Sequence, residues 1–309
     1  MMSPTPTTPS LPAAPHVPPR AGAVLREQVR AVGLVLRAPA LGAAALLTLA
    51  TVLSVKQLLA GAGPFSFHPE LSMVPGLAGL LLPLFVWRGE QRFGPGFFWT
   101  LPVDRRQHAL AKVLAGWVWL MAAVALLFLW LLALTLLSGG NPLAEETLRL
   151  LPGAVAGAKD VDPAALQPLR RAPQPLLWLV PFTAASGAYV LASALMLGLR
   201  RPLRWLAGGV LAVFLVLSVS QAMSAGWLVD RLEGLLQTFF TGRYGVDALL
   251  TAKAETLHTE VTLTTGETVG VWRALPHLGQ WALATLLWMG TGIVALWAAA
   301  SRHREQRRG

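Results

Sequence analysis

The chain has 309 residues, of which 54% are hydrophobic and 13% charged, and it carries a formal net charge of +10. Charged residues make up roughly 25% of a soluble domain, so this composition predicts a membrane protein. The absence of cysteine excludes a disulfide framework, thiolate catalysis, iron–sulfur clusters and Cys-ligated zinc. Because excess basic residues in a membrane protein gather at one face of the bilayer, we expect no nucleic-acid partner.

The first segment, 1–20, contains seven prolines among Ser, Thr and Ala. It lacks the basic start and apolar run of a signal peptide, so its composition predicts a disordered cytoplasmic tail. The next segment, 24–37, spaces apolar residues at helical intervals and keeps its arginines largely off that face. It predicts an amphipathic helix in the membrane interface. The apolar positions are Leu25, Val29, Val32 and Leu36.

Six apolar runs follow this helix. A helix needs about 20 apolar residues to cross a bilayer. The predicted spans are 38–59, 71–87, 113–137, 176–199, 205–219 and 281–300. The predicted fold class is therefore all-α, a polytopic membrane domain over 21–300 with six transmembrane helices and a basic cytoplasmic tail at 301–309.

The basic residues predict the orientation of these spans. Sixteen of the 25 Lys and Arg residues lie in the tails, the first helix and the loops after the second and fourth spans, together with four of the 15 acidic residues. The opposite side holds nine basic and 11 acidic residues. Since Lys and Arg stay in the cytoplasm, both termini are expected there, which agrees with an even number of spans.

Two long loops are then external, 138–175 and 220–280. Asn141 before Pro142 predicts the start of a short helix, and Asp162 before Pro163 repeats that signal. Residues 226–240 predict an amphipathic helix on the outer leaflet. Two β-prone stretches, 260–263 and 268–272, flank a turn and predict a small external hairpin.

The segment 88–112 is the longest charged stretch between two apolar runs, and it is rich in aromatic residues, glycine and proline. A short helix over 89–99 is predicted to end before Leu101-Pro102, because the residue before proline avoids helical angles. Asp104 and Gln107 form a capping pair that predicts a helix start near Arg105.

The run Thr100-Leu101-Pro102-Val103-Asp104-Arg105-Arg106, followed by Lys112, resembles a Leu-Pro-Val-Ser-Arg then Gly-Lys pattern. That pattern belongs to the second cytoplasmic loop of type-2 ATP-binding-cassette (ABC) permeases. Here Asp104 replaces the usual Ser and Ala111 the usual Gly. The order of apolar segments resembles this family over nearly the whole chain, and segment 24–37 occupies the place of its elbow helix.

The resemblance implies a permease subunit of an ATP-driven transporter in the cell (inner) membrane, more often an exporter than an importer. Its expected partners are cytoplasmic ATPase subunits, which bind ATP and Mg, and a second permease chain, identical or related. Residues implied to couple the loop to the ATPase are Glu90, Arg92, Thr100, Pro102, Asp104, Arg105, Arg106 and Lys112. By periodicity alone, the sequence favours a basic segment anchored at lipid headgroups, and it is the resemblance that favours the coupling role.

The spans themselves contain no ionisable residue other than Lys56 near one end. Ion-coupled carriers place such groups at the midplane, so the driving force is expected to come from elsewhere. The stretch 153–160 lacks the Gly-Lys-Ser/Thr ending of a phosphate loop. We therefore predict no cofactor site and no metal site in this chain.

The fourth span carries a polar face that could line a translocation path. Serine and threonine in membrane helices more often bond a neighbouring helix or their own backbone, and that alternative stays open. The residues are Thr183, Ser186, Tyr189 and Ser193.

Two further functions are open at this stage. One is a membrane subunit or carrier that is not driven by ATP. The other is an intramembrane serine protease, since Ala184-Ala185-Ser186-Gly187-Ala188 faintly resembles the nucleophile motif of rhomboid proteases, with His277 as base. The predicted depths of Ser186 and His277 differ, however, and a nucleophile needs its base within about 3 Å. We expect no catalytic residue in this chain.

Overall fold

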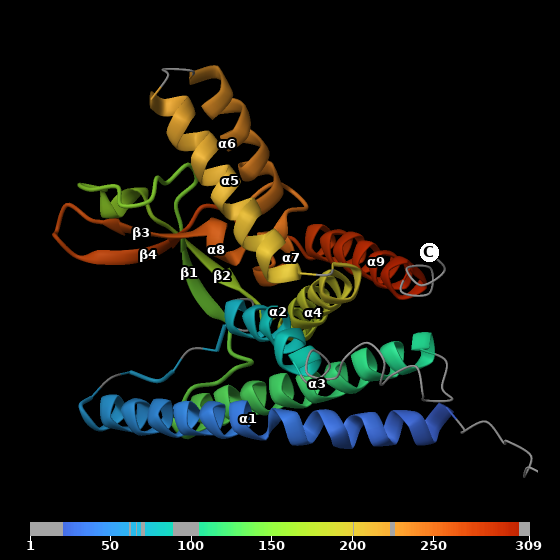
Figure 1. Ribbon diagram of the computed structural model, residues 1–309. Coiled ribbons are helices and arrows are strands. Elements are labelled where there is room, and N and C mark those ends of the chain that lie inside the picture. The colour runs from blue at the N-terminus through green and yellow to red at the C-terminus, as the bar shows by residue number, and fades with distance from the viewer. Residues whose placement is uncertain are drawn as a thin grey trace, which may run out of the picture.

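A computed structural model of the protein describes residues 21–61, 63–65, 67–68, 72–88, 105–199, 201–222 and 226–302. Helices make up 71% of the structure. Long apolar helices form a bundle, and a small β-sheet lies at one end of it (Figure 1). The prediction of an all-α fold is therefore too narrow, because the loops between the spans contribute a sheet.

The apolar helices of the described residues are α1 (Ala21–Leu59), α2 (Met73–Arg88), α3 (Arg105–Leu137), α4 (Val180–Gly198), α5 (Pro202–Ala222) and α9 (Leu278–Arg302). In that part of the chain, four helical stretches are long and apolar enough to cross a membrane: Gly22–Leu59, Arg106–Leu137, Pro175–Gly198 and Leu278–Ser301. The apolar parts of α2 and α5, Met73–Trp87 and Pro202–Val216, are shorter. Four membrane-crossing helices are thus supported, and spans two and five stay predictions.

Helix α1 corrects the prediction of a separate interfacial helix. The structure has one continuous helix of 39 residues with Pro39 inside it, where the sequence indicated a helix over 24–37 and then a span. Val32 and Leu36 are buried in a cluster with Val86 of α2 and Ala115 of α3. The apolar face that was expected to rest on lipid packs on these helices instead.

Helix α4 is the centre of the bundle. It packs against α2, α3 and α9, and its inward positions are small. A β-carbon built on Gly79 of α2 would lie 2.2 Å from the carbonyl oxygen of Ala185, so the backbones of α2 and α4 approach closely. Small residues allow this approach, and van der Waals packing then holds membrane helices together.

The helices alternate in direction. Tyr189 of α4 contacts Val113 near the start of α3, whereas the earlier Ser186 contacts the later Trp117, so α3 and α4 are antiparallel. Helices α1 and α3 begin on the side where α9 ends, at the right of Figure 1. We call this side the basic end, because Arg26, Arg106, Lys112 and Arg201 lie on or next to it along the chain.

The sheet lies at the other end of the bundle (Figure 1). In the described residues it has four strands in the order β2-β1-β4-β3: β1 (Glu146–Leu150), β2 (Gln167–Arg171), β3 (His258–Thr262) and β4 (Thr268–Trp272). Strands β3 and β4 pair antiparallel around a turn in which Gly266 has a φ of +83°. β1 joins them through a parallel contact between Leu150 and Trp272. The external position of the sheet stays a prediction.

The loop before β1 contradicts one predicted helix. The Asn141 side chain accepts a hydrogen bond from the backbone N–H of Leu143 at 3.0 Å, but the chain then extends into β1 because Leu148 is buried against β4. The helix start predicted at Asp162 and Pro163 is confirmed. The Asp162 side chain accepts from the Ala164 N–H at 2.9 Å, and the short 3-10 helix η3, Pro163–Ala165, follows.

The second loop holds three helices in the described residues, α6 (Gly226–Phe240), α7 (Val246–Thr251) and α8 (Ala254–Leu257). The bounds of α6 confirm the helix predicted over 226–240. It packs against α5, and the two helices lean away from the rest of the bundle in Figure 1. That α6 rests on the outer leaflet stays a prediction.

Candidate functional site

The predicted coupling segment lies at the basic end, between α2 and α3. Helix α3 begins at Arg105, as the Asp104 and Gln107 pair predicted. The predicted helix over 89–99 falls outside the described residues, as do Glu90, Arg92, Thr100, Pro102 and Asp104 and the side chain of Arg105. The structure therefore places two of the predicted coupling side chains, Arg106 and Lys112.

Lys112 connects the start of α3 to the end of α2. Its Nζ atom lies 4.9 Å from the ring centroid of Trp87. An ammonium over an indole face is attracted by the ring quadrupole, and Trp is the strongest partner for such a contact. Trp87 is the penultimate residue of α2, so this contact joins the two helix ends that flank the basic segment.

Arg106 connects the start of α3 to α9. The Arg106 Cζ atom lies 5.1 Å from the ring centroid of Trp297, in the last two turns of α9. On another face of α3, the His108 Nδ1 atom lies 3.4 Å from the Gln28 Nε2 atom of α1. The first two turns of α3 thus contact α1, α2 and α9 together.

Helix α3 is longer than one membrane crossing requires. The helix has 33 residues, or about 50 Å at 1.5 Å per residue, whereas the hydrocarbon core is about 30 Å thick. The charged residues of α3 all precede Val113, so the length in excess of one crossing falls at the basic end.

The predicted path residues of α4 take part in helix packing in the described structure. Tyr189 donates to the carbonyl oxygen of Val113 at 2.8 Å, and Thr183 donates to backbone carbonyls of its own helix. Ser186 accepts from the Trp117 Nε1 atom at 3.0 Å. The hydrogen bonds of Tyr189, Thr183 and Ser186 fit the alternative in which polar side chains bond a neighbouring helix or their own backbone. Ser193 is fully buried, and a role of these residues in a path stays a prediction.

The same serine was the nucleophile of the protease alternative. Ser186 Oγ also contacts the Met121 sulfur at 3.6 Å, and both of its neighbours belong to α3. Among the hydrogen bonds of the described residues, Ser186 has no histidine partner. The backbone carbonyl of His277 accepts from Trp281 N–H at the start of α9.

Helix α7 packs against α2, α4 and α9, which the sequence did not indicate. Leu249 is buried against Gly187 of α4, and Leu250 lies against Gly76 of α2. The carboxylate of Asp247 accepts from Thr251 and Thr256 and fixes the turn after α7. The available signal was the short apolar run after Gly245, too short to identify a buried helix.

Within the described residues, no group of three or more His, Asp or Glu side chains could hold a metal ion. The chain matches no protein-family model, no curated protein and no solved structure. Function must therefore be inferred from the chain's own residues and contacts.

Proposed function

We propose that this chain is the permease subunit of an ATP-driven ABC transporter, acting as an exporter in the cell membrane with both termini in the cytoplasm. Separate ATPase subunits, which bind ATP and Mg, dock at the basic end. A second permease chain, identical or related, completes the path. Movement of the ATPase is transmitted through segment 88–112 to α3 and shifts the bundle between its inward-open and outward-open arrangements.

The observation that carries this proposal is the anchoring of the start of α3. Its first two turns contact α2 through Lys112, α9 through Arg106 and α1 through His108, and in this proposal they extend out of the membrane. A loop that served only to keep basic residues on the cytoplasmic side would need no such contacts. A rigid helix tied to three others converts a push on the preceding segment into a movement of the bundle.

One further feature supports it. The apolar parts of the described spans carry no Asp, Glu, Lys, Arg or His apart from Lys56 near the end of α1, so they offer no group to couple to an ion gradient.

The proposal is tested by purifying the tagged chain from its native membrane and measuring the ATPase that is retained with it. Charge reversal of Arg105 and Arg106 to Glu should abolish or strongly reduce the amount of ATPase retained on the tagged chain, because a cationic projection becomes anionic. In the matched control, Arg149 and Arg170 are replaced by Glu. These residues lie on β1 and β2 at the other end. This control should retain the ATPase.

Two outcomes would overturn the coupling role. One is an unchanged ATPase yield with the Arg105 and Arg106 variant when both variants reach the membrane in equal amounts. The other is an equal loss with the control pair, which would show a general charge effect. A chain that retains no ATPase in any form would favour the carrier that is not driven by ATP.

A further inference from the structure

A cavity lies at the junction of the sheet and the bundle, where β1 begins, β2 ends and the 3-10 helix η4 (Pro175–Leu179) leads into α4. Its volume is about 30 Å³. A cavity needs roughly 10–15 Å³ of such volume to hold a single water. This cavity is therefore large enough for one small polar group and too small for a whole large ligand. It lies away from the basic end and from every residue of the predicted coupling segment.

Two aromatic rings line one side of the cavity. Phe67 and Trp178 have ring centroids 5.7 Å apart and meet at 85°. Phe128 of α3 packs behind both, at 5.2 Å from Phe67 and 5.8 Å from Trp178. The Phe67 side chain is buried, so the aromatic wall is held in place before any ligand arrives.

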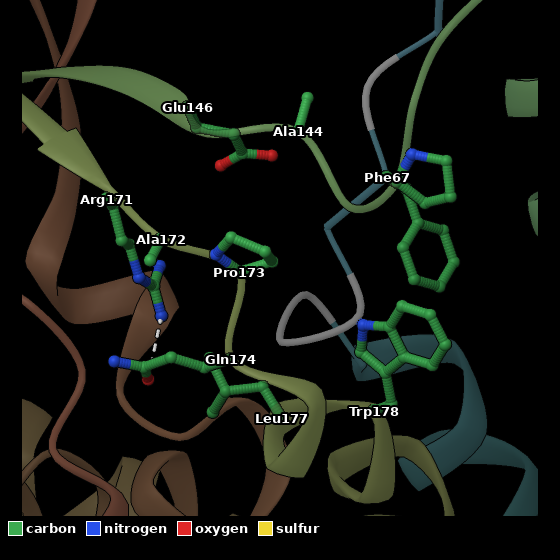
Figure 2. A pocket seen from close by; sticks show the side chains of 10 residues that line it. Phe67, Ala144, Glu146, Arg171, Ala172, Pro173, Gln174, Leu177 and Trp178 are labelled. Carbon is green, nitrogen blue, oxygen red and sulfur yellow. Dashed lines mark hydrogen bonds between the residues drawn. The ribbon is translucent and has the colours of Figure 1, made fainter.

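A carboxylate completes the cavity. Glu146, the first residue of β1, extends its side chain from the strand toward the side where Phe67 and Trp178 lie (Figure 2). A carboxylate beside aromatic faces is the arrangement that recognises ammonium and quaternary ammonium groups, because the charge and the ring quadrupoles attract a cation together. Burial in a partly enclosed site strengthens both attractions.

Two cationic groups lie near Glu146. Arg171 stands opposite Glu146 in the pairing of β1 with β2 and also lines the cavity, where its buried side chain donates to the Gln174 side-chain oxygen at 3.4 Å (Figure 2). The His68 Nδ1 atom lies 3.9 Å from the Glu146 carboxylate. The part of the lining that attracts a cation is the Glu146 carboxylate together with the Phe67 and Trp178 rings.

We propose that this cavity binds the ammonium group of an organic cation, held by the Glu146 carboxylate and the rings of Phe67 and Trp178. The same ammonium chemistry is present in free choline or ethanolamine and in the headgroups of zwitterionic phospholipids. The aromatic cluster continues onto α4, where the Phe182 ring centroid lies 5.9 Å from that of Phe128, so a headgroup at the bilayer surface could reach the site. The proposal does not depend on ATP-driven transport.

The test uses the full chain in nanodiscs of phosphatidylglycerol, a lipid without an ammonium group. Choline is titrated by calorimetry, and native mass spectrometry measures retention of phosphatidylcholine against phosphatidylglycerol. Glu146→Gln should weaken choline binding, or the preference for phosphatidylcholine, roughly tenfold, because the charge is lost from a partly enclosed site. Trp178→Phe should weaken it roughly threefold, since a smaller ring gives a weaker cation–π contact.

The matched control is Glu145→Gln, which removes the same charge from the exposed neighbouring position and should leave binding within about twofold of the unchanged chain. Binding of free choline alone shows that the bound ammonium group belongs to a soluble amine. Retention of phosphatidylcholine alone shows that it belongs to a lipid headgroup. Either result supports the proposal.

Three results would overturn it: equal binding by the Glu146→Gln variant and the unchanged chain, no binding of choline with no lipid preference, or binding of phosphate that is lost in Arg171→Gln. A melting curve of each variant in the same nanodiscs shows that the chain is folded, so a loss of binding cannot be ascribed to unfolding.

Discussion

Helices α4 and α5 are similar in length and both strongly apolar, yet they occupy opposite environments. Over half of the apolar window of α4 is buried by other helices, whereas α5 leaves side chains such as Val210 and Phe214 more than 60% exposed. The inward positions of α4 are mostly Ala, Gly and Ser, with Tyr189 as a large exception. The large side chains that α5 leaves exposed are mostly Leu and Val, with Phe214 and Trp205.

This difference shows what drives packing in a bilayer. Lipid tails are as apolar as leucine, so a large apolar side chain gains little by leaving lipid for another helix. Small residues allow backbones to approach closely, and interhelical hydrogen bonds add to that contact. Apolarity therefore predicts that a helix enters the membrane, and the small and polar residues decide whether it lies inside the bundle.

The largest effect is expected from a β-branched residue at the closest helix contact. Gly79→Val would place its β-carbon against the Ala185 carbonyl oxygen, at 2.2 Å before any adjustment, and should destabilise the chain by about 2–3 kcal/mol through overpacking. Gly209→Val on α5 is the control, since nothing lies within 4 Å of that position. Thermal unfolding in detergent measures both, and equal midpoints would contradict the close approach of α2 and α4.

A smaller effect is expected from the buried hydroxyl of α4. Tyr189→Phe removes the hydrogen bond to the Val113 carbonyl and should cost about 1 kcal/mol. The chain has two tyrosines, so Tyr244→Phe is a matched control at a partly exposed site that should change little. The same unfolding assay applies. Equal stability of both variants would show that the Tyr189 hydroxyl does not link α3 and α4.

The smallest effect is expected on the exposed face of α5. Leu211→Ala should change the stability of the single chain by less than about 0.5 kcal/mol, because the Leu211 side chain is 58% exposed. A loss of about 2 kcal/mol or more that grows on dilution would instead show that α5 is buried against a second copy of the chain. Unfolding at several protein concentrations distinguishes the two results.

The start of α3 illustrates how far the sequence predicted the candidate site. Asp104 and Gln107 mark the first turn locally, and the structure begins α3 at Arg105. The contact of Arg106 with Trp297 could not be predicted, because nothing local in the sequence of α9 indicates which helix it meets. The short helix predicted to start at Asn141 is absent, and Glu146 in that region begins a strand and lines a cavity.

By itself, the sequence determined that the chain has helices apolar enough to cross a membrane, where most of these helices lie and which segments carry the basic residues. These properties depend on the free energy of transfer of each segment from water to lipid, which its own composition sets. The tertiary structure decided that α1 is continuous, that α4 lies at the centre, that α7 packs on α2, α4 and α9 and that two separate loops share a sheet. Those outcomes depend on contacts between segments far apart in the chain, and such contacts leave no periodic pattern in either segment.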